Sequence, residues 1–238
     1  MFPQTRFHYI EAPELDSTNE EARRLLQAEA LSGPAIIRAH QQTAGRGTQG
    51  RTWHSPAGAG LYFSVVHPFA GWVEVPPALV PITPLFTLAA GVACAESVRD
   101  LTGLELQLKP INDLCVNGQK LGGILVESLI SQNQCQALIT GIGINVFEQD
   151  SIIAACLEEG RGNQPISLQA CIPPHHFEQF LRLDGGQGQA LMRELCDAIA
   201  GTVDDLYRAL ILGEHRSILA RYRECQLPGT ELRIPPTL

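Results

Sequence analysis

Residues 114–127 read LCVNGQKLGGILVE, and this stretch decides the fold class that the sequence predicts. Two short apolar runs, at 114–116 and 124–127, flank Asn117-Gly118, a dipeptide typical of a tight hairpin turn. Residues 137–146, ALITGIGINV, predict a further strand shortly afterwards. Strands joined by such short connections do not form a regular β-α-β series, so this region favours a mixed sheet.

The pattern on either side of this stretch completes the prediction of an α+β fold, a mixed β-sheet with packed helices. Upstream, capping residues and acids predict a helix from Asp16 to about Ala30. Apolar periodicity predicts further strands at 35–39, 61–66 and 104–108, and a helix at 84–101. Downstream, residues 148–188 are irregular in character, and the sequence predicts helices at about 189–210 and 213–222 and a short strand at 231–234.

Bulk composition is that of a globular protein with a sizeable core. Of 238 residues, 45% are hydrophobic and 18% are charged. No apolar run reaches the ~18 residues of a membrane span, and residues 1–14 do not resemble a secretion signal. Seven cysteines without a CxxC pair predict reduced thiols and a cytoplasmic location. The net charge of −8 argues against broad binding to DNA, although a local cationic pocket for a nucleotide is compatible with it.

The loop GRGTQGR, residues 45–51, is the first candidate for ligand binding. Its glycines let backbone N–H groups approach a ligand closely, and Arg46 and Arg51 carry charge suited to a carboxylate or a phosphate. It is not a P-loop, because no GxxxxGK[ST] pattern occurs. A flexible surface loop is the open alternative.

Two further segments in the first half carry polar groups beside glycines. Residues 109–113, KPIND, combine a lysine at a strand end with an Asn-Asp pair, and residues 120–127, KLGGILVE, place Gly122 and Gly123 before an apolar strand. Glycines in strands often permit close backbone approach. A solvated lysine and a tight hairpin are the alternatives for these two segments.

The remaining two candidates are a strand and a helix start. In GIGINV, residues 141–146, alternating glycine and isoleucine predict a smooth face for a flat ligand, with Asn145 placed to hydrogen-bond it. Ser17-Thr18-Asn19 makes a good helix N-cap, and a helix start with hydroxyls can also bind a polar head group. For the strand, packing in the core is the open alternative.

Taken together and in this order, these segments resemble the biotin–protein ligases. That family has a Ser-Thr-Asn helix start, a glutamine and a GRGRxGR loop, a KWPND segment, a KLxGILVE strand and a GIGINV strand. The matching positions here are Ser17-Thr18-Asn19, Gln42 and the ranges 45–51, 109–113, 120–127 and 141–146. The resemblance covers residues 14–147 well and the remainder weakly.

The resemblance implies both a fold and a reaction. The fold is that of the catalytic domains of class II aminoacyl-tRNA synthetases and of biotin and lipoate ligases. The reaction is the ATP-dependent, Mg²⁺-assisted conversion of biotin to biotinyl-AMP, followed by transfer of biotin to a lysine of a biotin carboxyl carrier protein, such as an acetyl-CoA carboxylase subunit. The cofactors and substrates implied are therefore ATP, biotin and Mg²⁺, with no metal site built from the protein alone.

The resemblance also assigns roles to individual residues. Ser17, Thr18 and Gln42 would hydrogen-bond the ureido ring, and Lys109 and Arg46 are the candidate catalytic residues. Asn112 would position the nucleotide or Mg²⁺, and Trp53 would stack on the adenine. The complete set implied for binding biotin and the adenylate comprises Ser17, Thr18, Asn19, Gln42, Gly45, Arg46, Gly47, Thr48, Arg51, Trp53, Lys109, Asn112, Gly122, Gly123 and Asn145.

Two departures from the family pattern fall within these motifs. Thr48 stands where the loop has its second arginine, which removes a cation that would hold an anionic adenylate. Pro110-Ile111 replaces the Trp-Pro of KWPND, so the backbone around Lys109 differs.

The domain limits follow from where the motifs lie. They begin at residue 17, which leaves no room for an N-terminal DNA-binding domain, and we expect no DNA partner and no membrane contact. We expect a catalytic domain at 1–222 and, at 223–238, a truncated remnant of the small β-barrel that ends many relatives. An exposed sheet edge would allow a homodimer.

Two other functions compete with biotin ligation. A lipoate or octanoate ligase on the same fold would need a longer apolar tunnel and a different glycine-arginine motif. A non-catalytic biotin-binding homologue would release no pyrophosphate, and Thr48 together with the short C-terminus favours it.

Overall fold

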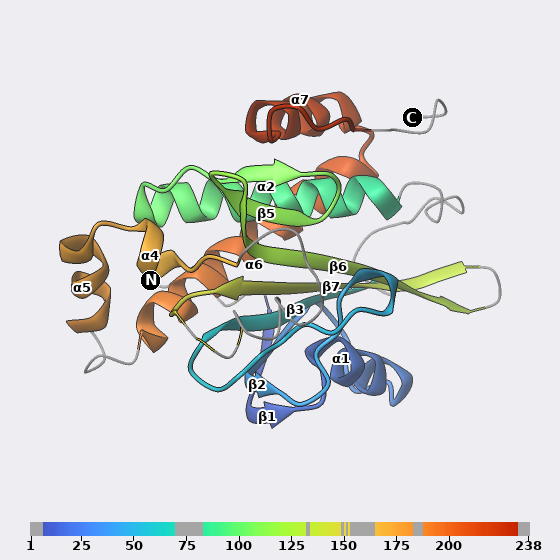
Figure 1. Ribbon diagram of the computed structural model, residues 1–238. Coiled ribbons are helices and arrows are strands. Elements are labelled where there is room, and N and C mark those ends of the chain that lie inside the picture. Colours follow the sequence, from blue (N-terminus) through green and yellow to red (C-terminus); the bar gives the residue numbers. More distant parts are fainter. Residues whose placement is uncertain are drawn as a thin grey trace, which may run out of the picture.

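A single seven-stranded sheet organises the protein (Figure 1). The computed structural model describes residues 7–69, 83–131, 134–148, 150, 152, 165–182 and 188–232. The strand order is β1-β2-β3-β7-β6-β5-β4, and only the β1–β2 pair is parallel. The strands are β1 (His8–Leu15), β2 (Ala35–Gln42), β3 (Gly60–Pro68), β4 (Gln107–Lys109), β5 (Asp113–Val116), β6 (Gln119–Ser131) and β7 (Gln134–Asn145).

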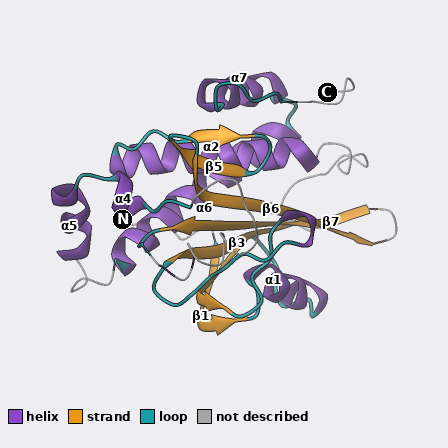
Figure 2. Cartoon of the chain, viewed as in Figure 1, coloured by secondary structure: helices purple, strands orange, loops and turns teal. Residues whose placement is uncertain are grey.

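Helices cover the two faces of this sheet unequally (Figure 2). On one face, α1 (Thr18–Gln27) packs over β2, β3 and β7. On the other face, the long helices α2 (Thr83–Thr102) and α6 (Gln189–Ile211) form the main core, and α7 (His215–Cys225) packs outside α2. The remaining helical segments are η1 (Thr48–Gly50), α4 (Leu168–Cys171) and α5 (Pro174–Arg182).

The main core forms because strands β3 and β7 alternate in what they bury. Leu61, Phe63 and Val65 of β3 and Ile142 and Ile144 of β7 all join the cluster beneath α2 and α6. Side chains at intervening positions point to the other face. That face is less filled by helix, because α1 is short, so space remains beside α1 for a cavity.

The structure confirms the predicted α+β class and most of the predicted elements. The tight turn at Asn117-Gly118 joins β5 to β6, with both residues at positive φ. The three helices predicted at 84–101, 189–210 and 213–222 correspond to α2, α6 and α7.

Several elements differ from the prediction. The first strand, β1, was not predicted, because it is an edge strand whose residues are largely half-buried or exposed and show no clear apolar alternation. Helices α4 and α5 lie within 148–188, which were predicted to be irregular; in α5 only Phe177 is buried, so its apolar signal is weak. The predicted strand at 231–234 was wrong for Glu231 and Leu232, which lie in no strand, and its other two residues lie outside the described residues.

The expected domain boundary at 222/223 falls inside α7. Beyond that helix, the Leu227 N–H donates to the Leu108 carbonyl at 2.9 Å, and Gln226 forms an isolated bridge to the same residue of β4. The described tail therefore runs beside the β4 edge of the sheet. Its interpretation as a barrel remnant stays a prediction.

Two expectations from composition concern thiols and membrane spans. The six cysteines within the described ranges, Cys94, Cys115, Cys135, Cys171, Cys196 and Cys225, are all free, as predicted. Among the helices of these same ranges, none combines the length and apolar character needed to cross a bilayer.

A buried ionisable pair joins β3 to α6. His67 Nε2 lies 3.4 Å from Asp204 Oδ1, both side chains are fully buried, and Arg208 contacts the same carboxylate at 3.1 Å. Burial lowers the pKa of His67, and this effect outweighs the neighbouring carboxylate. Burial alone would raise the pKa of Asp204, but its bonds to His67 and Arg208 lower it to about 2.

We predict that stability falls as the pH is lowered from 7.5 to 5. The unfolded chain takes up a proton on His67 near its ordinary pKa of about 6.5, whereas the folded protein resists that proton until lower pH, so acid favours unfolding. Urea unfolding midpoints across this range measure the slope. His67→Gln should be less stable at pH 7.5 but show a flatter slope, and His175→Gln, at an exposed position of α5, is the control. Equal slopes for His67→Gln and the wild type would contradict the assignment.

Candidate functional site

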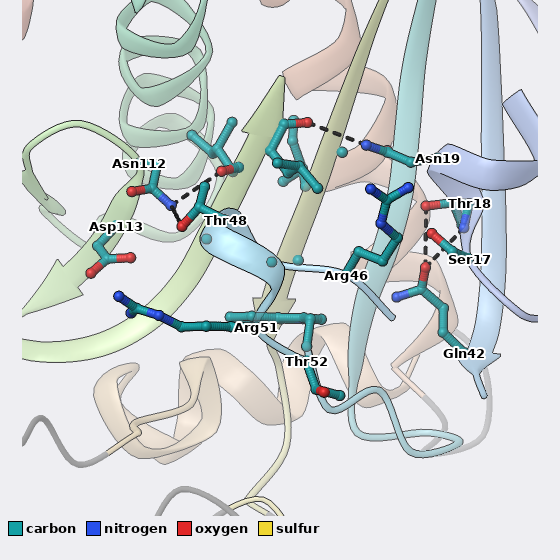
Figure 3. Close-up of a pocket in the computed structure, with 18 of the residues that line it drawn as sticks. Ser17, Thr18, Asn19, Gln42, Arg46, Thr48, Arg51, Thr52, Asn112 and Asp113 are labelled. Carbon is teal, nitrogen blue, oxygen red and sulfur yellow. Dashed lines mark hydrogen bonds between the residues drawn. The ribbon is translucent and has the colours of Figure 1, made fainter. Parts of the chain in front are cut away.

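A cavity of about 320 Å³ opens on the α1 face of the sheet, between the start of α1, the loop after β2 and strands β6 and β7 (Figure 3). The residues that line it are Ser17, Thr18, Asn19, Gln42, Arg46, Gly47, Thr48, Arg51, Thr52, Trp53, Lys109, Asn112, Asp113, Lys120, Gly123, Ile124, Leu125, Gly141, Ile142 and Gly143. Figure 3 shows Ser17, Thr18 and Gln42 together at one end and Asn112 and Asp113 at the other.

The floor of the cavity is backbone rather than side chain. Gly123 of β6 pairs with Gly143 of β7, and Gly141 follows two residues away on the same face. A Cβ at Gly143 would lie 2.3 Å from Trp53 Nε1, and one at Gly141 would lie 2.4 Å from Asn19 Oδ1. These positions therefore require glycine, and the Trp53 indole lies directly on the floor.

One end of the cavity is lined by neutral hydrogen-bonding groups. The Thr18 N–H donates to Gln42 Oε1 at 2.9 Å, and Gln42 Nε2 donates to Ser55 Oγ at 2.8 Å. Ser17 is the N-cap residue of α1, but its side chain makes no capping hydrogen bond. Its hydroxyl lines the cavity and is free to rotate towards a ligand.

The loop after β2 folds back as a hairpin over the cavity. The Gly47 N–H donates to the Arg51 carbonyl at 2.8 Å, and the Trp53 N–H donates to the Gly45 carbonyl at 2.9 Å. Gln49 and Gly50 at its tip have φ angles of 58° and 72°. The side chain of Arg46 reaches back to α1 and β6, where it pairs with Glu20 and, at 3.3 Å, with Glu127.

The other end of the cavity is cationic. Lys109 and Lys120 both line it, and Arg51 projects from the loop. Lys120 Nζ lies 2.5 Å from Asp113 Oδ1 and 5.5 Å from the centre of the Trp53 ring. Among the described lining residues, Asp113 is the one acid beside four basic side chains, so the cavity attracts anions although the chain is acidic overall.

The cavity brings together most of the residues predicted for the site. The lining includes Ser17, Thr18, Asn19, Gln42, Arg46, Gly47, Thr48, Arg51, Trp53, Lys109, Asn112 and Gly123. Of the other predicted residues, Gly45 and Gly122 lie behind the wall: a Cβ would lie 2.4 Å from the Trp53 carbonyl oxygen at Gly45 and 2.6 Å from the Gly143 carbonyl oxygen at Gly122. Both are therefore needed for packing.

Asn145 is placed elsewhere. Its Nδ2 donates to the Ile166 carbonyl at 3.1 Å, and it lines a second cavity of about 250 Å³ beyond the end of β7. Its predicted role in binding a nucleotide stays a prediction.

The predicted binding set left out several residues that the structure places at the cavity, although Lys120 and Asp113 belong to the candidate segments KLGGILVE and KPIND. Lys120, Asp113 and Thr52 line it, while Glu20 and Glu127 pair with Arg46 just outside. Lys120 begins the KLGGILVE segment, but the sequence alone favours a solvated charge for a single lysine at such a position. The partners Glu20 and Glu127 are 107 positions apart in numbering, and no local pattern indicates that they meet.

A family model described as the biotin/lipoate A/B protein ligase family matches residues 12–145. This range contains the whole cavity and more than half of the chain. The fold and the cavity thus define a ligase-type α+β domain, and the chain belongs to the biotin/lipoate A/B protein ligase family.

Individual relatives within this family are named as ligases. The bifunctional ligase/repressor BirA of Bacillus subtilis is 35% identical over 142 residues, which cover 60% of this chain and 41% of that protein. The biotin–[acetyl-CoA-carboxylase] ligase of Paracoccus denitrificans is 36% identical over 171 residues, which cover 70% of this chain and 66% of that protein. The chain thus spans about two fifths of the first of these relatives.

Solved structures agree with the sequence relatives. Biotin protein ligase from Leishmania major in complex with biotin matches with a TM-score of 0.65 at 26% identity, over 98% of this chain and 86% of that one. The complex of the same ligase with biotinyl-5-AMP gives a TM-score of 0.63. These matches bear out the expected similarity to biotin ligase catalytic domains.

We predict that Gly143→Ala displaces Trp53 from the cavity floor, because the added Cβ would lie 2.3 Å from the indole nitrogen. In a Trp72→Phe background, fluorescence reports Trp53 alone, and the emission should shift to the red. Gly201→Ala in α6, where a Cβ meets nothing within 4 Å, is the matched control. An unchanged spectrum in folded Gly143→Ala would show that the indole does not rest on this floor.

Proposed function

We propose that this protein activates biotin with ATP to form biotinyl-AMP and transfers the biotin to a lysine of a biotin carboxyl carrier protein. The observation that supports this proposal most directly is one cavity that has neutral hydrogen-bonding groups at one end, a glycine floor in the middle and basic side chains at the other end. This arrangement matches biotin, which has a polar ureido ring, an apolar body and a carboxylate. The names and bound ligands of the relatives support the same choice.

In the proposed complex, the ureido ring binds beside Ser17, Thr18 and Gln42, because it needs both donors and acceptors. The ring body lies beside Asn19 and the Trp53 indole, which pack on Gly141 and Gly143, and the carboxylate points to the cationic end. The Trp53 indole, which packs on this floor, offers an aromatic face on which a ligand ring would stack.

The first step joins biotin to the nucleotide. A biotin carboxylate oxygen attacks the α-phosphorus of ATP, the bond to the β-phosphate oxygen breaks, and pyrophosphate leaves. Negative charge builds on the phosphorus oxygens, and Lys109, Lys120 and Arg46 are the cations that stabilise it. In the second step, the carrier lysine amine attacks the acyl carbon, and AMP leaves.

Magnesium fits this site as a companion of the triphosphate. Mg²⁺ commonly binds through one or two carboxylates together with substrate phosphates. Asp113, with the amide oxygen of Asn112 beside it, is the oxygen donor set that the cavity offers. When bound, the ion would neutralise charge on the leaving pyrophosphate.

The partners and location complete the proposal. The carrier domain would present its lysine at the mouth of the cavity. A homodimer would form through β1, which lies at one edge of the sheet. Free thiols at all six described cysteines fit the reducing cytoplasm.

We predict that biotin-dependent ATP–pyrophosphate exchange depends on both cavity lysines. Lys109→Met and Lys120→Met keep the length of each side chain and remove its charge, and each should lower the exchange rate by roughly 100-fold. Lys120→Met should also free Asp113 from its ion pair.

Lipoate is the substrate control for this exchange assay, and Arg182→Met, at an exposed position of α5, is the matched charge control. Exchange with lipoate in place of biotin would favour the lipoate ligase alternative. Measurable biotin binding without exchange would identify a non-catalytic binder and overturn the proposed activity.

We further predict that Thr48→Arg prolongs retention of the adenylate. Thr48 Oγ1 lies 3.5 Å from Asn112 Nδ2, so its side chain reaches the part of the cavity where we place the nucleotide. A guanidinium there adds a charged hydrogen bond to phosphate and should slow adenylate release by roughly tenfold. Rapid filtration of radiolabelled biotinyl-AMP measures release. Thr48→Gln supplies a long uncharged side chain as control, and equal retention by both variants would exclude the charge as the cause.

A further inference from the structure

A chain of hydrogen bonds runs behind the neutral end of the cavity and links residues from α1, β2, β3 and β6. Asn19 Nδ2 donates to Glu127 Oε2 at 2.8 Å, and Ser64 Oγ lies 2.6 Å from Asn19 Oδ1 and 2.7 Å from Thr18 Oγ1. Ser64 is fully buried, and neither it nor Glu127 lines the cavity. Both nevertheless contact residues that do.

Glu127 determines which atoms donate and which accept in this series of hydrogen bonds. Its carboxylate is flanked by Arg23 at 3.2 Å and Arg46 at 3.3 Å, and carboxylate oxygens accept hydrogen bonds from such donors. The Asn19 amide must therefore turn its NH₂ group towards Glu127. As a result, Asn19 Oδ1 faces Ser64 and can only accept from it.

Ser64 transmits this direction to Thr18. Its hydroxyl has one hydrogen, and because Asn19 Oδ1 has none to give, that hydrogen goes to Asn19. The Thr18 hydroxyl has two acceptors within reach, Ser64 Oγ at 2.7 Å and Gln42 Oε1 at 3.4 Å. Because the Ser64 hydrogen is used on Asn19, the shorter of these two contacts is a hydrogen bond in which Thr18 donates to Ser64. Because its hydrogen is donated to Ser64, Thr18 Oγ1 offers only lone pairs to the cavity.

The Gln42 side chain, in contrast to Thr18, is oriented so that it offers a hydrogen-bond donor to the cavity. Its Oε1 accepts from the Thr18 N–H, which orients its Nε2 towards Ser55 Oγ, and Ser55 in turn donates to the Trp53 carbonyl at 3.2 Å. One Nε2 hydrogen is used in this bond and the other remains for a ligand. The cavity thus offers an acceptor from Thr18 beside a donor from Gln42.

We propose that Ser64 and Glu127 are positioning residues that determine ligand specificity by fixing Thr18 as an acceptor. The matching ligand carries an N–H next to a C=O, as one edge of a urea does. This inference rests on the proposed function, in which that edge belongs to the ureido ring of biotin. It adds that the site selects the ureido N–H and rejects an isosteric group that cannot donate.

Two cyclic carbamate analogues of biotin test this selection, each with one ureido N–H replaced by a ring oxygen. The replacement keeps the shape of the ligand but exchanges a donor for an acceptor. In the analogue whose oxygen faces Thr18, lone pairs oppose lone pairs, and the wild type should bind it roughly tenfold more weakly than the other isomer.

Ser64→Ala removes the group that holds the Thr18 hydrogen in the wall. The Thr18 hydroxyl then rotates and donates to the ring oxygen, so the ratio between the two isomers should fall to about twofold. A purely structural loosening would weaken both isomers equally and leave their ratio unchanged. Thr140→Val is the matched control, because it removes another fully buried hydroxyl, one bonded to Tyr207 at 2.8 Å away from the cavity lining.

Glu127→Gln provides a second variant that does not depend on Ser64→Ala folding well. A glutamine amide can donate to Asn19, which removes the constraint on the Asn19 amide, so this variant should also lower the isomer ratio. Its altered contact with Arg46 would change the affinity for both isomers alike and is cancelled in the ratio.

Isothermal titration of the 238-residue chain with biotin and both analogues gives these ratios, and separates this inference from the proposed function. If the wild type binds no biotin, both are overturned. The wild type could instead bind biotin without distinguishing the isomers, or Ser64→Ala and Glu127→Gln could keep the wild-type ratio. Either result would overturn only the inference that Ser64 and Glu127 fix Thr18 as an acceptor. A lowered ratio in both variants, with the wild-type ratio in Thr140→Val, is the expected result.

Discussion

The alternation of glycine and isoleucine in β7 is the constraint on which the rest of the structure depends. Ile142 and Ile144 anchor the core beneath α2 and α6, while Gly141 and Gly143 on the opposite face let Asn19 and Trp53 approach the backbone closely. One strand therefore supplies both the apolar surface that stabilises the fold and the floor of the cavity. A shift of register by one residue would exchange the two faces and abolish both.

The charge of the cavity lining differs in sign from that of the whole chain. The cavity gathers four basic side chains, but two of them are partly neutralised: Arg46 by Glu20 and Glu127, and Lys120 by Asp113. These contacts satisfy the cations before a ligand arrives. They also mean that an anionic ligand competes with carboxylates already present, so affinity depends on the difference between the two sets of interactions.

The sequence was sufficient to predict what local patterns encode. The turn at Asn117-Gly118, the long helices and the glycine-rich loop each have a short-range signature, and the loop, Gln42 and the start of α1 do meet at one cavity. The edge strand β1 escaped prediction because one of its sides is open to solvent, which weakens the apolar alternation. Lys120 and Glu127 lie in the candidate segment KLGGILVE but received no individual role, and Ser64 was not singled out, because their contacts join strands that are distant in the sequence.

Asn19 links the glycine floor to the hydrogen bonds that run from Glu127 through Ser64 to Thr18. This side chain lies directly over Gly141, where a Cβ would approach its Oδ1 to 2.4 Å, so only glycine leaves room for it. In that position its amide bridges Glu127 and Ser64, and its orientation decides whether Thr18 offers a lone pair or a hydrogen. The glycine that shapes the cavity thus also makes room for the group that sets its hydrogen-bonding polarity. Shape and chemical selectivity in this site follow from one backbone position.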